Sequence, residues 1–224
     1  LAHEVRNPLT AISIHLQLIK TYQNQTGHQQ DINECLDIIR EEVEHLNAVT
    51  SYFLSTARPV DIHPLPKDIS EVVQKTASLI RPEIEEQDAH FSLQVLDHTL
   101  TVLLDEDILR LALMNLMRNA LSALPAQCGH VQLSVTEEKH LVKISVSDNG
   151  SGIPLHQQEK IFEPYFTTKK NGSGLGLTLV YKVIKEHGGS ISVRSPLGTS
   201  EKGTCFTISL PKENYDKLQL PLLQ

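Results

Sequence analysis

Residues 171–178 read NGSGLGLT, a glycine-rich stretch in the second half of the chain. Gly172, Gly174 and Gly176 alternate, and a helical pattern over residues 175–189 begins within the stretch. Glycines in this arrangement turn backbone N–H groups and the positive end of a helix toward an anion, so the stretch predicts a phosphate site. It is not a Walker A loop, because no GK[ST] follows, and its spacing differs from the dinucleotide fingerprint.

A second glycine-containing stretch, DNGSGI at residues 148–153, follows an alternating pattern that predicts a strand. Gly150 and Gly152 tolerate positive φ and a close approach of the backbone to a ligand. Asp148, at the strand end, can accept a hydrogen bond from an exocyclic amine. Taken alone, a common Asp-Asn-Gly turn is the simpler interpretation.

A third cluster, NLMRNALSA at residues 115–123, belongs to a strongly helical segment, residues 105–124. Asn115 and Asn119 are four residues apart and therefore share one helix face. An amide oxygen is a suitable neutral ligand for a magnesium ion that keeps most of its waters and phosphates. Taken alone, the two asparagines more simply cap or solvate the helix.

The segment between the two glycine stretches, IFEPYFTTKK at residues 161–170, has no clear period. It carries Phe162 and Phe166, and a loop of this kind is usually functional or disordered. We expect it to form a glycine-hinged lid over a ligand.

The order of the remaining elements predicts an α+β two-layer sandwich, one sheet backed by helices. Gly188 is expected to close the helix that begins at residue 175. The other expected elements are a helix near 69–81, strands at 91–96 and 100–104, a strand hairpin over 131–148, and final strands at 190–195 and 204–210.

In the first 58 residues the pattern is different, because apolar residues recur at helical and heptad spacing. Two helices joined by a short loop form an antiparallel hairpin, which cannot bury such a seam alone. We therefore expect a second copy to complete a dimeric four-helix bundle, and packing of the seam on the second half of the chain is the alternative. The seam residues are Leu9, Ile12, Leu16, Ile19, Ile32, Leu36, Ile39, Val43, Leu46, Phe53 and Ala57.

Composition excludes several function classes. The net charge is −7, and nothing indicates the basic face of a nucleic-acid-binding protein. The cysteines, Cys35, Cys128 and Cys205, lie far apart, which predicts reduced thiols in a cytosolic compartment. No apolar run approaches the length of a membrane span, and no signal peptide is visible. Because the sequence begins without methionine inside a helical pattern, we expect an upstream region outside it.

In this order, the clusters resemble the N, G1, F and G2 boxes of the ATP-binding domain shared by gyrase, heat-shock protein 90, histidine kinases and the MutL repair proteins. This is the Bergerat or GHKL fold. The first ten residues, LAHEVRNPLT, then resemble the H box of a sensor histidine kinase. The sequence HEVRNPLT resembles the corresponding sequence of sporulation kinases of bacilli and of the nitrogen-regulation group of sensors.

The resemblance implies a role for each motif residue. His3 is the phosphate acceptor, and Glu4 holds or deprotonates its ring. Asn7 orients a water that dephosphorylates the partner protein. Asn119 holds Mg2+, and Asp148 selects adenine. The implied ATP-binding residues are Asn115, Asn119, Asp148, Gly150, Gly152, Phe162, Phe166, Lys169, Gly172, Gly174, Leu175, Gly176 and Leu177.

The implied activity is ATP-dependent autophosphorylation of His3, transfer to an aspartate of a response regulator, and phosphatase activity toward that regulator. The expected partners are a second copy, a response regulator receiver domain and, optionally, a protein inhibitor of the helical hairpin, with no nucleic acid. We expect the cytoplasmic portion of a protein anchored to the membrane by an N-terminal sensor region. The expected domains are a dimerisation and phosphotransfer domain at 1–58, a linker at 59–68, a catalytic ATP-binding domain at 69–212 and a tail at 213–224.

Two other functions compete with this one, an ATPase of the repair or chaperone type and a non-enzymatic nucleotide-gated scaffold. In those hydrolases a glutamate four residues before the metal asparagine activates water, but here that position is Asn115, and an amide cannot act as a base. A degenerate scaffold predicts lost glycines, and none is lost. Some relatives have a basic residue where this chain has Ser122. We expect Arg118, Lys169 or Lys170 to supply that charge.

A simpler interpretation of the opening stretch makes Asn7 an N-cap and Pro8 the first helical residue, which leaves His3 on a tail. The resemblance favours a helix that runs through His3. Pro8 then cannot donate to the carbonyl of Glu4, and we expect it to kink the helix one turn after His3.

Overall fold

The computed structural model describes residues 2–23, 28–57, 61–169, 172–196 and 202–212, without the side chains of residues 2–5, 44–45 and 47–57. The chain forms two compact units. The first consists of residues 1–58 with residues 164–175, and the second consists of residues 59–163 with residues 176–224.

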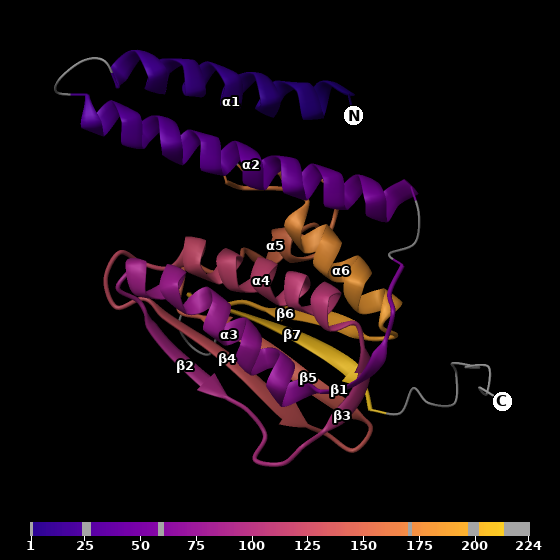
Figure 1. Ribbon diagram of the computed structural model, residues 1–224. Helices are drawn as coiled ribbons and strands as arrows, with labels where there is room; N and C mark the ends of the chain where they lie inside the picture. Colours follow the sequence, from indigo (N-terminus) through magenta and orange to yellow (C-terminus); the bar gives the residue numbers. More distant parts are fainter. Residues whose placement is uncertain (1, 24–27, 58–60, 170–171, 197–201, 213–224) are drawn as a thin grey trace. The chain divides into compact units, whose positions relative to one another are not determined.

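The first unit is built on two long helices, α1 (Ala2–Tyr22) and α2 (Gln29–Ala57) (Figure 1). The prediction that a helix runs through His3 is confirmed, and Pro8 lies inside that helix. The alternative in which Asn7 caps the helix is therefore wrong. The kink expected at Pro8 stays a prediction.

Contacts at the turn join the two helices into the expected hairpin. The ring of His28 stacks on Tyr22 with 5.0 Å between ring centroids. His28 Nδ1 lies 2.6 Å from Asp31 Oδ2, and Ile32 N donates to His28 O at 3.0 Å, which starts the first turn of α2. Within the described part of the chain, no helix combines the length and the apolarity that crossing a membrane needs.

The second unit contains a five-stranded sheet with the strand order β2-β4-β5-β7-β6. Its strands are β2 (His90–Gln94), β4 (His130–Glu137), β5 (Leu141–Asp148), β6 (Ser190–Arg194) and β7 (Thr204–Pro211). β2 and β4 are parallel, and the other neighbouring strands are antiparallel. In β5, Val142, Ile144 and Val146 are buried and alternate with more exposed residues, as expected for a sheet with one covered face.

Helices α3 (Ile69–Glu86), α4 (Glu106–Ala123) and α6 (Gly176–Glu186) cover one face of this sheet (Figure 1). A short helix, α5 (Leu155–Gln158), follows β5. The predicted α+β sandwich is confirmed, but α3 is longer than expected because it continues through Pro82. Ile84, beyond that proline, is only 1% exposed. Burial of its side chain offsets the hydrogen bond that Pro82 removes.

Residues 65–68, which the sequence assigns to the linker, form a strand. This strand, β1 (Leu65–Asp68), pairs antiparallel with β3 (Thr101–Leu104). The partner strand lies beyond α3 and β2 in the chain, so no local pattern indicates the pairing. Asp68 then caps α3, and its carboxylate accepts from Ser70 N at 3.0 Å.

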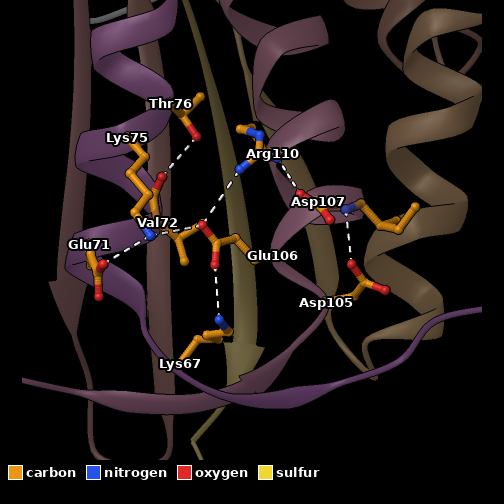
Figure 2. Close-up of polar contacts among 10 residues, drawn as sticks. Lys67, Glu71, Val72, Lys75, Thr76, Asp105, Glu106, Asp107 and Arg110 are labelled. Atoms are coloured by element: carbon orange, nitrogen blue, oxygen red, sulfur yellow. Dashed lines mark hydrogen bonds and ion pairs between the residues drawn. The ribbon is translucent and has the colours of Figure 1, made fainter.

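Figure 2 shows an ion-pair network that ties β1 and α3 to the first turn of α4. The carboxylate of Glu106 lies 3.1 Å from Lys67 Nζ and 3.1 Å from Lys75 Nζ. Arg110, one turn later, lies 3.5 Å from the same carboxylate. The hydrogen bonds from Lys75 and Lys67 lower the pKa of Glu106 below its ordinary value.

Candidate functional site

Helix α4 presents two asparagines on a half-exposed face. Its N-cap is Asp105, whose carboxylate accepts from Ile108 N at 3.2 Å. Leu116, the next residue after Asn115, is fully buried. Asn115 and Asn119, one turn apart, are both partly accessible, as the shared helix face predicts.

The start of α6 lies against the first of these asparagines. Asn115 Nδ2 donates to Leu111 O at 2.9 Å. A Cβ added at Gly176 would lie 2.9 Å from Asn115 Oδ1, so the backbone of Gly176 approaches this side chain closely. The structure thus brings the asparagine motif together with the first residue of the helix that follows the phosphate-type glycine stretch.

The other glycine stretch lies at the C-terminal end of α4. Ser151 N donates to Ala123 O at 3.1 Å. A Cβ at Gly150 would lie 2.4 Å from the same oxygen, and Gly152 has a φ of 78°. Both positions require glycine, one for space and one for conformation. Gly150 and Gly176 therefore both lie against α4, one at its C-terminal end and the other beside Asn115.

Asp148 ends β5 with a buried side chain, 6% exposed. Gly150 N donates to its Oδ1 at 2.8 Å, and the backbone N–H of Thr204 donates to the same carboxyl group. Burial raises the pKa of Asp148 above its ordinary value, and the two backbone donors oppose that rise. A carboxyl group held in this way has lone pairs left for a donor on a ligand.

The two phenylalanines of the expected lid belong to different units. Phe162 is part of the second unit, where its ring lies 5.8 Å from that of Tyr181 and 6.4 Å from that of Phe206. Thr178 also donates its hydroxyl to Phe162 O at 3.1 Å. Phe162 is therefore an anchor between α6 and β7. Phe166 is half-buried in the first unit.

Residues 164–175 fold back on themselves within the first unit. Gly174 has a φ of 68° and Tyr165 a φ of 64°. A Cβ added at Gly174 would lie 2.4 Å from the carbonyl carbon of Tyr165, so the backbones of the two ends are in contact. At Gly172 an added Cβ would lie 2.4 Å from Thr167 Oγ1. The expected movement of this segment as a lid stays a prediction.

The residues expected to supply a positive charge differ in their surroundings. Arg118 Nη2 lies 2.9 Å from Glu83 Oε1 on α3, so its charge is already matched by a carboxylate. Burial of the amine lowers the pKa of Lys169, although the residue as a whole is exposed. Lys170 lies outside the described residues. Which of the three supplies a phosphate contact stays a prediction.

The opening motif lies on α1. His3 and Glu4 are helical, and their side chains are outside the described part of the structure. Asn7 is exposed and stands one turn after His3, on the same face of the helix.

Sequence reasoning missed the start of β7 as part of the site. Gly203 N donates to Gly150 O at 2.8 Å, and Thr204 N donates to Asp148. The residues GTCF, 203–206, were the available signal, because they follow a run of mostly polar residues in the sequence and open an alternating pattern. Their partners lie on a distant strand, which the sequence does not identify.

Comparison with known proteins agrees with this geometry. Residues 1–60 match the family described as the His Kinase A (phospho-acceptor) domain, and residues 104–214 match the Histidine kinase-, DNA gyrase B-, and HSP90-like ATPase family. The chain is 33% identical over 210 residues to sensor histidine kinase ZraS of Escherichia coli (strain K12). It is 31% identical over 212 residues to sporulation kinase B of Bacillus subtilis (strain 168). These matches cover 94% and 95% of this chain, but only 44% and 48% of the relatives.

Solved structures are also similar. The catalytic domain of histidine kinase ThkA matches with a TM-score of 0.60 and 30% identity, over 67% of this chain and 98% of that domain. ThkA in complex with the response regulator protein TrrA matches with a TM-score of 0.72 and 28% identity, over 95% of this chain and 60% of that one. The helical hairpin with His3 and the sandwich whose glycine and asparagine motifs meet at α4 thus place this chain in the sensor histidine kinase family.

Proposed function

We propose that this chain is the catalytic core of a two-component sensor histidine kinase, which phosphorylates its own His3 with ATP and passes the phosphate to an aspartate of a response regulator. The observation that carries this proposal is one chain that holds both a phosphoacceptor-type helix with His3 and an ATPase-type fold. An ATPase alone is disfavoured, because the amide of Asn115 cannot take a proton from water.

The proposed chemistry starts at the imidazole of His3. A neutral ring nitrogen attacks the γ-phosphorus of ATP, the bond from phosphorus to the bridging oxygen breaks, and ADP leaves. Glu4, the next residue of α1, holds or accepts the proton of the other ring nitrogen. Such a transfer depends mainly on the positioning of the two groups and on the neutralisation of phosphate charge.

The phosphate end of the site is assigned to residues 172–176 and to the N-terminal end of α6, where backbone N–H groups and the helix dipole favour anions. Asn119 is proposed to hold Mg2+, which neutralises phosphate charge. In the described ranges no three or more His, Cys, Asp or Glu side chains are grouped to hold a metal. An ion at Asn119 would be coordinated mainly by phosphate and water oxygens, as is usual for Mg2+.

Asp148 is proposed to recognise adenine. Gly150 N and Thr204 N orient its buried carboxyl group. The exocyclic amine of adenine can donate to that group, whereas guanine carries a carbonyl oxygen at the corresponding position. The result is a preference for ATP over GTP.

The hairpin is proposed to pair with a second copy of itself. Large apolar side chains of both helices are exposed in the single chain, and most of them belong to the predicted seam. A second hairpin would cover such a stripe and complete a four-helix bundle. The exposed fractions are 53% for Leu9, 51% for Ile14, 49% for Leu16, 51% for Leu36 and 44% for Val43.

The response regulator is proposed to dock beside His3, since the solved ThkA complex contains such a regulator. Asn7 is exposed on the same helix face and is proposed to orient the water that removes phosphate from the regulator. The chain spans less than half the length of ZraS and of sporulation kinase B. A sensor region, a membrane anchor and a protein inhibitor of the hairpin stay predictions.

The test is incubation of the chain with γ-labelled ATP and Mg2+, followed by acid and alkali treatment. We expect a label on the protein that acid removes and alkali leaves, because phosphohistidine is acid-labile and alkali-stable. His3→Ala should abolish the label while ATP binding, measured by calorimetry, persists. A label that survives in His3→Ala, or that resists acid, overturns the assignment.

A further inference from the structure

The hydroxyl of Ser195, directly after β6, is a buried polar group to which the proposed function gives no role. The residue is 6% exposed and belongs to none of the nucleotide motifs. Its Oγ accepts from Ile153 N at 2.7 Å and donates to Gly203 O at 2.7 Å. It also lies 3.3 Å from Thr204 Oγ1. One buried hydroxyl therefore joins the stretch after β5 to the start of β7.

These contacts use the whole hydrogen-bonding capacity of Ser195. A serine hydroxyl has one hydrogen and two acceptor lone pairs. Gly203 O takes the hydrogen, while Ile153 N and the hydroxyl of Thr204 fill the two lone pairs. No capacity remains for a ligand, so Ser195 can influence a nucleotide only through the segments that it joins.

Those two segments are the ones that orient Asp148. Gly203 N donates to Gly150 O at 2.8 Å, and the backbone N–H groups of Gly150 and Thr204 donate to the carboxyl group of Asp148. Ser195 thus holds both sides of this arrangement at once. Without its hydroxyl, Gly203 C=O loses a buried partner and Ile153 N–H loses a partly buried one.

We propose that Ser195 is a positioning residue for nucleotide selection, which holds residues 148–153 against residues 203–204 and thereby fixes the pose of Asp148 for adenine. This inference rests on the proposed role of Asp148. Gln158 reinforces the same junction, since its Nε2 donates to Ile153 O at 2.9 Å and to Ser195 O. A loop released at this junction would present a carboxyl group with no defined direction.

The test measures the dissociation constants of ATP and GTP for the wild type, Ser195→Ala, Ser195→Thr and Asp148→Ala. We expect Ser195→Ala to weaken ATP by roughly 10-fold while GTP changes little, because the loss of two backbone partners loosens only the adenine contact. Ser195→Thr keeps the hydroxyl and should restore most of the preference for ATP. Ser192→Ala is the matched control, because Ser192 is an exposed serine of β6, the strand that Ser195 follows.

A residue that only stabilised the fold would lower the melting temperature without changing the ratio of the two constants. A folded Ser195→Ala protein with the wild-type ratio of ATP to GTP affinity therefore overturns the inference. If Ser195→Ala does not fold, Ser195→Cys carries the same test, since sulfur is a weak donor and acceptor of similar size. We then expect an intermediate loss of the preference, and a wild-type ratio overturns the inference.

The outcomes also separate this inference from the proposed function. If the wild type prefers ATP, Asp148→Ala loses that preference and the Ser195 variants keep it, only the role of Ser195 is wrong. If Asp148→Ala keeps the preference, or the wild type has none, the adenine role of Asp148 is wrong and the inference is overturned with it.

Discussion

The hairpin and the sandwich differ in how completely they bury their apolar side chains within one chain. In the sandwich, Leu113, Ile144 and Ile208 are fully buried by elements of the same unit. In the hairpin, Leu36 and Val43 are 51% and 44% exposed although they follow a regular apolar track. The core of the sandwich is therefore complete within one chain, whereas the hairpin leaves apolar side chains exposed that a second copy is proposed to cover.

The largest expected effect comes from charging the hairpin seam. Leu36→Asp combined with Val43→Asp should convert dimers to monomers, because two buried carboxylates per chain cannot be paired in the bundle. Light scattering on a sizing column measures the change, and calorimetry should show ATP binding unaltered in the sandwich. Leu46→Asp with Phe53→Asp should act likewise.

The matched control for the seam is Leu79→Asp on α3, since Leu79 is 57% exposed in the sandwich and lies outside the seam. This variant should stay dimeric. A wild type that is already monomeric at micromolar concentration would refute the dimer and, with it, the contrast between the two regions.

The next effect concerns the sandwich alone. Asp148→Ala should weaken ATP by roughly 10- to 100-fold, since a lost buried hydrogen-bond partner costs ~1–3 kcal/mol, and it should weaken GTP much less. Calorimetry with both nucleotides measures this, while light scattering should still show dimers. Equal losses for ATP and GTP would count against adenine recognition by Asp148.

A smaller and more selective effect is expected at Asn7. Asn7→Ala should leave autophosphorylation nearly intact and slow the removal of phosphate from the partner regulator, because positions 3 and 7 share a helix face. Autokinase and phosphatase assays on one preparation measure both steps. The structure already places Asn7 inside α1, so loss of an N-cap should not complicate the result. Unchanged phosphatase activity would rule out the proposed role.

The smallest effect is a pH-dependent one at Glu106, confined to the sandwich. Lys75 and Lys67 lower the pKa of Glu106 from its ordinary value of 4.5, so the ionised form stabilises the fold above pH 4.5. That stabilisation is lost as pH falls below 4.5 and through the lowered pKa. Glu106→Gln should reduce stability at pH 7 by about 1 kcal/mol or less, with no difference at strongly acid pH.

Thermal unfolding across pH measures this difference. Asp107→Asn is the control, because the Asp107 side chain is 81% exposed. Its ion pair in Figure 2 is with Arg110 and involves neither lysine. A gap between wild type and Glu106→Gln that stays constant from pH 7 to acid would contradict the linkage.

Much of the fold could be predicted because its signals are local. Alternation of apolar residues predicts β4 and β5, and the acids at 105–107 predict the start of α4. β1 could not be predicted, because Pro66 interrupts its pattern and its stability comes from pairing with β3. The helix predicted near 69–81 continues to Glu86 as α3, although a proline lies inside it, and the burial of Ile84 that stabilises this end depends on tertiary packing.

The candidate site, too, could be predicted only in part from the sequence. The sequence indicated which residue types cluster, such as Asn115 with Asn119, because helical spacing is fixed by the backbone. It did not indicate that Phe162 packs between Tyr181 and Phe206, or that Arg118 binds Glu83. These contacts join residues from different elements, and no spacing rule connects them.

The sequence by itself determined the family, the sandwich and the hairpin, because glycine, asparagine and heptad patterns act within a few residues of chain. Only the tertiary structure decided that Gly150 and Gly176 lie against α4, that Gly176 closely approaches Asn115, and that Ser195 joins the two segments around Asp148. The physical reason is that close approach and the pairing of buried polar groups depend on which distant elements pack together. Packing is a property of the whole fold, and local patterns do not contain it.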